Sequence, residues 1–427
     1  MRLLDSIYYV FMPILYVHGV ANRTDASGNL EGWSEIEAFL RYYVAGEISD
    51  QPDLVDVSYA YWGDLGVKMY WQGASRPRSQ LLGMGGATMP AASMAETAEM
   101  LESLDSLPPK QMLPAPKPSG LISAGRTVGI AAGGKSRLAD LSDDQRADLL
   151  VSIARSRNRP AADLLLVDEL ARNAAFIAKL KAAKTPADEM VVVREAAIAL
   201  THKGLIAQGS GWWSNVADRL SEVYDRVDSA PANALTKLVM EARGKINDLA
   251  TGFIGDVFAY LQEKDQRPGA IRGRVLEAIR KARNAAPVDE PLIVVTHSMG
   301  GQIIYDLVTS FLEAENLRID FWVATASQVG FFEEMKAFIN SDPSIASPNR
   351  VPSPSAKVLG WWWNVWDPND IISYTAKPIF DKVLDDEAFE GGAALAQAHS
   401  TYLKRPSFYR KLAEKIQTAK ALNYNRI

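Results

Sequence analysis

The chain has 427 residues, of which 48% are apolar, so it has room for two or three average domains or for one large α/β domain with an insertion. Its formal net charge is -5 and it has no block of basic residues, which argues against a nucleic-acid partner, because phosphate binding needs clustered Lys and Arg. The sequence contains no cysteine, which excludes disulfides, thiolate metal sites and cysteine nucleophiles.

The first apolar stretch, residues 7–17, superficially resembles a signal peptide. It lacks a small-residue cleavage site, contains Pro13 and runs directly into His18-Gly19. It is also shorter than the about 20 residues that a membrane-spanning helix needs. We therefore expect a buried strand that ends at Val17 and a cytoplasmic protein, while export as an effector without a cleaved signal stays open.

A helix and a second strand are predicted after this first strand. Apolar residues at positions 33, 36, 39 and 40 indicate the helix, which should end near Gly46. Residues 54–62 alternate enough to form a strand, which Gly63-Asp64 closes. The order strand, helix, strand predicts a mostly parallel sheet flanked by helices, which is an α/β fold.

Residues 67–251 are predicted to form a mainly helical insertion, while residues 1–66 and 252–427 form the α/β core. Residues 73–137 are rich in Gly, Ala, Met, Ser and Pro and have little periodicity, so we expect flexible loops there. The insertion follows an early strand, on the side where open α/β sheets bind ligands. We interpret it as a cap, or lid, over that side; the alternative is a separate helical domain with its own partner.

Helix signals recur in the second half of the insertion. Ser142 and Gln145 have the spacing of a capping box. Thr185-Pro186 fits an N-cap followed by the first helical residue. Between them, apolar residues at positions 166, 170, 174 and 177 predict one face of a helix.

The strongest functional motif lies in residues 291–306, PLIVVTHSMGGQIIYD. Apolar, β-branched residues before the turn predict a buried strand, and apolar residues at helical spacing follow it. Ser298 stands at the turn, with Gly300 and Gly301 after it, as in a nucleophile elbow, where a strained turn exposes a serine hydroxyl. Thr296 replaces the first glycine of the G-x-S-x-G pattern. The alternative is an ordinary Ser-Gly-Gly loop.

A serine nucleophile needs a base, and the base needs an acid that orients it. In this kind of sheet the base follows the last strand and comes after both the serine and the acid. Strands are predicted over residues 319–324 and 357–366, and His399 is the only one of the four histidines beyond them. We choose Asp370 as the acid over Asp367, which precedes a proline and is typical of a turn former.

Two backbone N–H groups are needed to stabilise the oxyanion that such a reaction forms. Met299, directly after the serine, would supply one, and Val20 or Ala21, in the turn after the first strand, would supply the other. We interpret His18 as a hydrogen-bonding residue that holds this turn. His297 is interpreted as a structural residue that points away from the substrate.

Five segments together resemble the α/β-hydrolase superfamily, in its bacterial lipase and esterase branch. They are LYVHGV at 15–20, VTHSMGG at 295–301, FWVATASQVG at 321–330, WWNVWDPNDIIS at 362–373 and AHSTYL at 398–403. The Ser-Gln pair at 327–328 and the Asn-x-x-Asp-Pro-x-Asp loop at 364–370 are also similar to those of GPI-inositol-deacylase-like lipases. The resemblance implies ester hydrolysis through an acyl-enzyme on a Ser298-Asp370-His399 triad, without a metal or an organic cofactor.

Tryptophans give the only indication of the substrate. Trp212-Trp213 and the cluster Trp361 to Trp363 could line an acyl pocket or lie at a membrane interface, or the cluster could pack inside a buried sheet. We favour a lipid-like ester, such as a phospholipid or an acylglycerol, with transient contact to a membrane surface. The alternatives are a small-molecule esterase, a regulated effector lipase, and a non-catalytic scaffold that binds a ligand or partner through its cap. The oligomeric state stays open.

Overall fold

The computed structural model describes residues 11–20, 22, 24, 30, 32–68, 137–155, 160–202, 253–287, 289–385, 388–391 and 398–425. The chain divides into two compact units, and each is described by itself. The first unit comprises Met1–Arg76, Asn247–Glu390 and Phe408–Ile427, and the second comprises Pro77–Ile246 and Gly391–Ser407.

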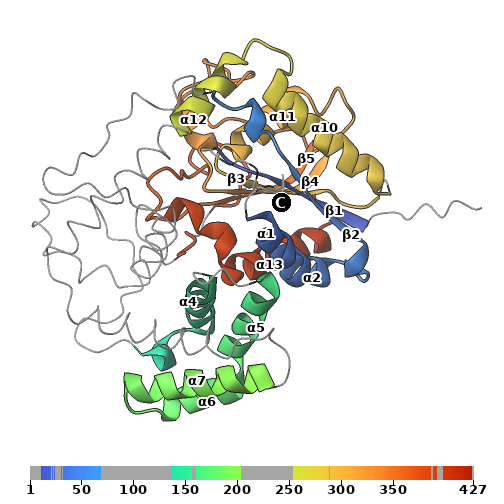
Figure 1. Ribbon diagram of the computed structural model, residues 1–427. Coiled ribbons are helices and arrows are strands. Elements are labelled where there is room, and N and C mark those ends of the chain that lie inside the picture. The colour runs from blue at the N-terminus through green and yellow to red at the C-terminus, as the bar shows by residue number, and fades with distance from the viewer. Residues whose placement is uncertain are drawn as a thin grey trace, which may run out of the picture. The chain divides into compact units, whose positions relative to one another are not determined.

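The first unit is built on a five-stranded sheet in which all neighbouring strands are parallel (Figure 1). The strands are β1 (Phe11–Val17), β2 (Val55–Ala60), β3 (Ile293–His297), β4 (Ile319–Thr325) and β5 (Leu359–Val365). All residues of β4 and β5 are buried, as their mainly apolar sequences predict for a sheet that is covered on both faces. The predicted α/β class is confirmed.

Helices cover both faces of this sheet (Figure 1). One face carries α10 (Ala270–Ala285), α11 (Gly300–Ser310) and α12 (Val329–Glu334), and the other carries α1 (Trp33–Phe39), the π-helical turn Leu40–Ala45, α2 (Gly46–Ile48) and α13 (Pro406–Ala421). On the first face, the rings of Trp322 and Trp362 stack with their centroids 4.7 Å apart. On the second, the rings of Phe39 and Tyr409 meet edge to face at 5.3 Å.

The strand order β2-β1-β3-β4-β5 reverses direction between β1 and β3. From β1 the chain proceeds to β2 on one side, and from β3 it proceeds through β4 to β5 on the other. Such a reversal opens a crevice at the carboxyl ends of the two neighbouring strands, which is where open α/β sheets bind ligands. The turns that follow β1 and β3 are therefore the expected position of a functional site.

The first unit is interrupted by residues 77–246 of the second unit, and two described segments that flank this interruption are in contact. The Val67 N–H donates to Asp256 Oδ1 at 2.7 Å, and a Cβ on Gly66 would lie 2.3 Å from the same oxygen. Asp256 belongs to a helical segment, residues 253–262. The residues between these two points thus form an insertion whose two ends meet.

The second unit is helical in its described part. It contains α4 (Asp143–Arg155), α5 (Ala161–Arg172), α6 (Ala174–Ala182), α7 (Pro186–His202) and the short 3-10 helices η5 (Leu138–Asp140), η6 (Ala398–Ser400) and η7 (Tyr402–Lys404). The predicted capping box is confirmed, because the Gln145 N–H donates to Ser142 Oγ at 3.2 Å and the Ser142 N–H donates to Gln145 Oε1 at 3.1 Å. The loops expected over residues 73–137, apart from Arg137, and Trp212-Trp213 lie outside the described residues.

The single helix expected over positions 166–177 is wrong. α5 ends at Arg172, and the side chain of Asn173 accepts hydrogen bonds from the N–H groups of Ala175 and Phe176, which makes it the N-cap of α6. Asn is among the preferred N-cap residues because its side-chain oxygen satisfies N–H groups that the helix cannot. A local hydrogen-bonding signal thus overrides the apolar spacing.

Residues 391–407 belong to the second unit, although the sequence pattern places them with the α/β core. Arg405 explains the attachment, since its Nη1 donates to Ser152 Oγ of α4 at 2.9 Å and its Nε donates to Gly391 O at 2.8 Å. Ser407 Oγ donates to Asp148, which is also on α4, at 2.6 Å.

Among the helices that the structure describes in either unit, none combines the length and the apolar character needed to cross a lipid bilayer.

Candidate active site

Ser298 lies in the turn between β3 and α11, in a left-handed backbone conformation with φ of 51°. Residues other than glycine rarely adopt this conformation, which costs about 1–3 kcal/mol and persists only where the surrounding structure holds it. Two hydrogen bonds hold it here: the Ser298 N–H donates to Thr325 O at 2.8 Å, and the Gly301 N–H donates to Ser298 O at 2.9 Å. The turn therefore has the strain that the elbow motif predicts.

The two glycines after the turn are required by close approaches to neighbouring segments. A Cβ on Gly300 would lie 2.4 Å from the carbonyl oxygen of Val17, the last residue of β1. A Cβ on Gly301 would lie 2.8 Å from Ser327 Oγ, two residues after the end of β4. The start of α11 thus passes closely over the ends of both strands that flank β3, and only glycine fits.

Thr296 occupies the position at which the elbow pattern usually has glycine. Its side chain is fully buried, donates through Oγ1 to Val323 O at 3.1 Å and accepts from Trp322 Nε1 at 3.0 Å. The hydroxyl is therefore satisfied in both of its roles inside the sheet. Threonine in place of glycine at this position therefore adds hydrogen bonds between β3 and β4.

The turn after β1 lies directly against the serine. A Cβ on Gly19 would be only 2.8 Å from Ser298 Cβ and 3.0 Å from His297 Nδ1, so the half-buried His297 is a neighbour of this turn. His18 is fully buried, and its Nε2 accepts a hydrogen bond from the Trp62 N–H at 3.0 Å. Its Nδ1 therefore carries the proton and donates to Gly19 O at 2.6 Å. His18 holds the turn, as the sequence predicts.

The candidate oxyanion donors lie on either side of this contact. Met299 is fully buried at the N-terminal end of α11, and Val20 is 8% exposed in the turn after β1. Within the described part of the chain, neither backbone N–H donates a hydrogen bond. Ala21 lies outside the described residues. Two buried N–H groups next to a strained serine are the arrangement that an oxyanion needs.

Both candidate acids lie in the loop after β5, and both are buried. Asp367 Oδ1 accepts from the Asn369 N–H at 2.8 Å, so Asp367 forms a turn of the kind that the sequence predicts. Asp370 Oδ1 accepts from the Ile372 N–H at 3.1 Å in a similar turn. The choice of Asp370 over Asp367 therefore stays a prediction.

A chain of buried amides ties this acid loop to the elbow helix. Gln302 Nε2, on α11, donates to Gln328 Oε1 at 2.6 Å, and Gln328 Nε2 donates to Ile372 O at 2.7 Å. The Tyr374 N–H donates to Ser327 O at 3.0 Å. Sequence reasoning missed the role of Gln302. The available signal was an amide in the buried first turn of a mainly apolar helix.

His399 lies half-buried in η6 of the second unit. Thr401 closes this short helix, since its N–H and its Oγ1 both donate to Ala398 O, at 3.2 and 2.9 Å. Ser298 and Asp370 belong to the first unit, so the assembly of the three side chains into a triad stays a prediction.

The tryptophan cluster after the start of β5 is part of the core. Trp361, Trp362 and Trp363 are 5%, 1% and 7% exposed. Trp361 Nε1 donates to Asn425 O at 3.0 Å, and the Trp363 ring stacks on Phe408. Of the interpretations that the sequence allows, packing inside the sheet is confirmed for this cluster, which therefore carries no information about the substrate.

Comparison of the chain with known protein families, with curated proteins and with solved structures found no match.

Proposed function

We propose that this protein is a serine hydrolase that cleaves carboxylic esters through an acyl-enzyme on Ser298. The observation that carries the proposal is the left-handed backbone of Ser298 at the point where the strand order reverses, with Gly19 in direct contact with it. Strain of this kind is concentrated at functional sites. A serine that only linked a strand to a helix would gain nothing from it.

The proposed reaction uses three side chains and two backbone N–H groups. His399 accepts the proton of the Ser298 hydroxyl as Oγ attacks the ester carbonyl carbon, and Asp370 orients and stabilises the imidazolium. The carbonyl oxygen becomes an oxyanion, which receives hydrogen bonds from Met299 and from Val20 or Ala21, each donor contributing about 10²–10³ in rate. Collapse expels the alcohol with the proton from the base. Water then attacks the acyl group in the same way and releases the carboxylic acid.

The architecture supports an α/β-hydrolase fold with a cap. The serine follows β3, the candidate acids follow β5 and His399 comes later still, which is the order expected for this fold. The insertion, whose ends meet at Val67 and Asp256, would be the cap. A metal or an organic cofactor has no role in this reaction.

A lipid-like ester is the proposed substrate class, and exposed apolar residues of the first unit support it. Ile371, next to the candidate acid, is 70% exposed, and Met335 at the end of α12 is 50% exposed. Phe331, also on α12, is 36% exposed and stacks on Tyr374 of the acid loop at 4.8 Å. All of these follow β4 or β5, at the edge of the sheet that carries Ser298. Apolar groups beside a reaction site suit an acyl chain or transient contact with a membrane surface.

The proposal is tested by the hydrolysis of p-nitrophenyl esters from acetate to palmitate. Ser298→Ala should lower kcat at least about 10³-fold. Ser310→Ala is the matched control, because it makes the same change at the end of α11, where the hydroxyl has no hydrogen-bond partner among the described residues. More than a tenth of the wild-type rate in Ser298→Ala would refute the proposal. Rates confined to short esters would point to a small-molecule esterase, and inactivity towards every ester to a binding scaffold.

A further inference from the structure

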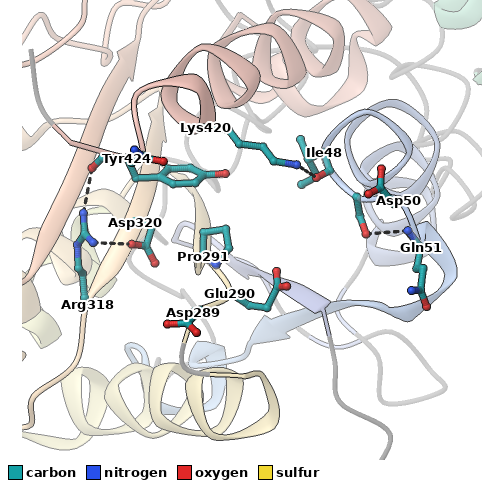
Figure 2. Close-up of a pocket in the computed structure, with 12 residues that line it drawn as sticks. Ile48, Asp50, Gln51, Asp289, Glu290, Pro291, Arg318, Asp320, Lys420 and Tyr424 are labelled. Atoms are coloured by element: carbon teal, nitrogen blue, oxygen red, sulfur yellow. Dashed lines mark hydrogen bonds and ion pairs between the residues drawn. The ribbon is translucent and has the colours of Figure 1, made fainter.

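A polar pocket of about 590 Å³ opens at the edge of the sheet opposite Ser298 (Figure 2). Its walls come from the residues before β3, the start of β4, the end of α2 with the segment that follows it, and the end of α13 with the turn that follows it. Pro291 in this pocket precedes Ser298 by about seven residues of mainly extended chain, or about 20 Å. The pocket is therefore separate from the candidate active site.

The two cations of this pocket are already engaged. Arg318 Nη1 forms an ion pair with Asp320 Oδ1 at 3.1 Å, and Arg318 Nη2 donates to Tyr424 O at 2.9 Å. Lys420 Nζ donates to Ile48 O at 2.8 Å. The charge of Arg318 is thus offset by Asp320, and both side chains are held by oxygen atoms of the protein, so the pocket is poorly suited to bind an anion.

The pocket is lined by more carboxylates than cationic side chains. Asp50, Asp289 and Glu290 line it without forming an ion pair to any residue that the structure describes. They approach from two sides, with Asp289 and Glu290 below and Asp50 on the far wall in Figure 2. With Lys420 as the one cation not matched by a carboxylate, the walls carry a net negative charge. A positively charged ligand would be attracted to it.

Tyr424 provides an independent sign of a ligand. The residue is 8% exposed, its hydroxyl has no hydrogen-bond partner among the described residues, and Figure 2 shows the hydroxyl pointing into the space between Lys420 and Glu290. Its pKa is raised, first by burial and then by the charges of Asp320 and Glu290, so it stays a neutral hydroxyl. A buried hydroxyl without a partner costs free energy, which a hydrogen bond from a bound ligand would recover.

The chain also holds Tyr424 in this position under strain. Asn423 and Tyr424 both have left-handed backbones, with φ of 49° and 52°, and the Tyr424 N–H donates to Ala419 O at 2.8 Å. Two successive residues in this conformation are costly and need the surrounding contacts to hold them. The backbone that carries the Tyr424 side chain is therefore held in place by the fold.

We propose that this pocket binds an aliphatic polyamine. No three carboxylate or histidine side chains of the described chain come close enough together to hold a metal ion, so the separated charges fit a longer molecule with several ammonium groups. One ammonium group lies between Asp289 and Glu290 and donates to the Tyr424 hydroxyl, and a second faces Asp50. The ligand binds away from Ser298 and acts as an effector or a stabiliser, not as a substrate.

The test is isothermal titration calorimetry of the full chain with spermidine, at constant ionic strength set with NaCl. Glu290→Gln should weaken binding about tenfold, because one close charge is lost. Tyr424→Phe should weaken it about threefold to tenfold without lowering the thermal midpoint of the unliganded protein, because the hydroxyl that it removes is unpaired. A purely structural role of Tyr424 would not move the affinity.

Glu334→Gln is the matched control, since it makes the same change on an exposed carboxylate of α12 outside the pocket. Its affinity for spermidine should equal that of the wild type. The proposal is overturned if spermidine gives no binding heat up to about 1 mM, if the control weakens binding as much as Glu290→Gln, or if inorganic phosphate binds and Glu290→Gln strengthens that binding.

Discussion

Replacing Gly19 by alanine should strongly impair catalysis in a protein that still folds. The new Cβ would lie 2.8 Å from Ser298 Cβ, whereas carbon atoms in contact are about 3.5–4.0 Å apart, so the two must separate by about 0.7–1.2 Å. The Cβ would also lie 3.0 Å from the backbone oxygen of His297, which cannot rotate away. A displacement of about 1 Å in a catalytic group lowers the rate about 10²-fold, while overpacking costs about 1–3 kcal/mol of stability.

The assay compares kcat/KM for p-nitrophenyl butyrate with the free energy of unfolding in urea. Gly46→Ala is the control, because nothing lies within 4 Å of its added Cβ and its backbone is helical, with φ of -62°. It should leave activity unchanged and stability equal or slightly higher. If Gly19→Ala kept kcat/KM within threefold of the wild type, the turn after β1 could not contact the nucleophile as described.

Three further outcomes follow from the structure. Asp370→Asn should lower kcat by about 10³–10⁴, with Asp367→Asn within about tenfold of the wild type, and the reverse ranking would make Asp367 the acid. Asp306→Asn should lower the free energy of unfolding in urea by about 3–5 kcal/mol, because it leaves the fully buried Arg272 without its counter-charge. Arg272 Nε lies 2.8 Å from Asp306 Oδ2. A loss below about 1 kcal/mol would contradict this expectation. Burial raises the pKa of Asp320 against the opposing effects of the Leu292 N–H and nearby arginines, so its protonation favours the folded state. Relative to Asp320→Asn, the wild type should therefore gain stability as the pH falls from 7 through the raised pKa towards about 4, as urea titrations would show, and a relative loss would contradict the assignment.

The sheet and the elbow were predictable because their signals are local. Residues 292–296 are a continuous apolar run before a turn with two glycines, and this pattern alone indicates a buried strand, a sharp turn and a helix. The structure adds the reason for each glycine, since Gly300 meets the backbone at the end of β1 and Gly301 meets Ser327. Contacts of this kind join segments far apart in the chain, so the sequence could not assign them.

The polar interior was not predictable in the same way. Tyr260, Arg272 and Asp306 form a buried group in which Asp306 Oδ2 accepts from both of the other side chains. The one local sign was a carboxylate in an apolar helix, and it did not identify the two residues that satisfy it. Burial of the tyrosine and the nearby charge of Asp306 raise the pKa of Tyr260. The group joins residues 253–262 to α10 and α11 and thereby fixes the point at which the insertion rejoins the first unit.

The turn-forming role of aspartate does not distinguish the two candidate acids, Asp367 and Asp370. A turn-forming role was the reason to set Asp367 aside, yet Asp367 and Asp370 each accept a hydrogen bond from the N–H two residues later. The rule is correct for both residues and therefore does not separate them. Only the position of each carboxylate relative to the base can decide, and that position depends on tertiary structure.

The central claim, that Ser298 is an activated nucleophile, is tested most directly by labelling with a fluorophosphonate probe. The labelled residue is located by mass spectrometry in the wild type, in Ser298→Ala and in His399→Ala, with Ser310→Ala as the control. We expect one label on Ser298 in the wild type and in the control, none in Ser298→Ala, and at least about 10³-fold slower labelling in His399→Ala. A label on another residue, or labelling that persists in Ser298→Ala, would contradict the claim.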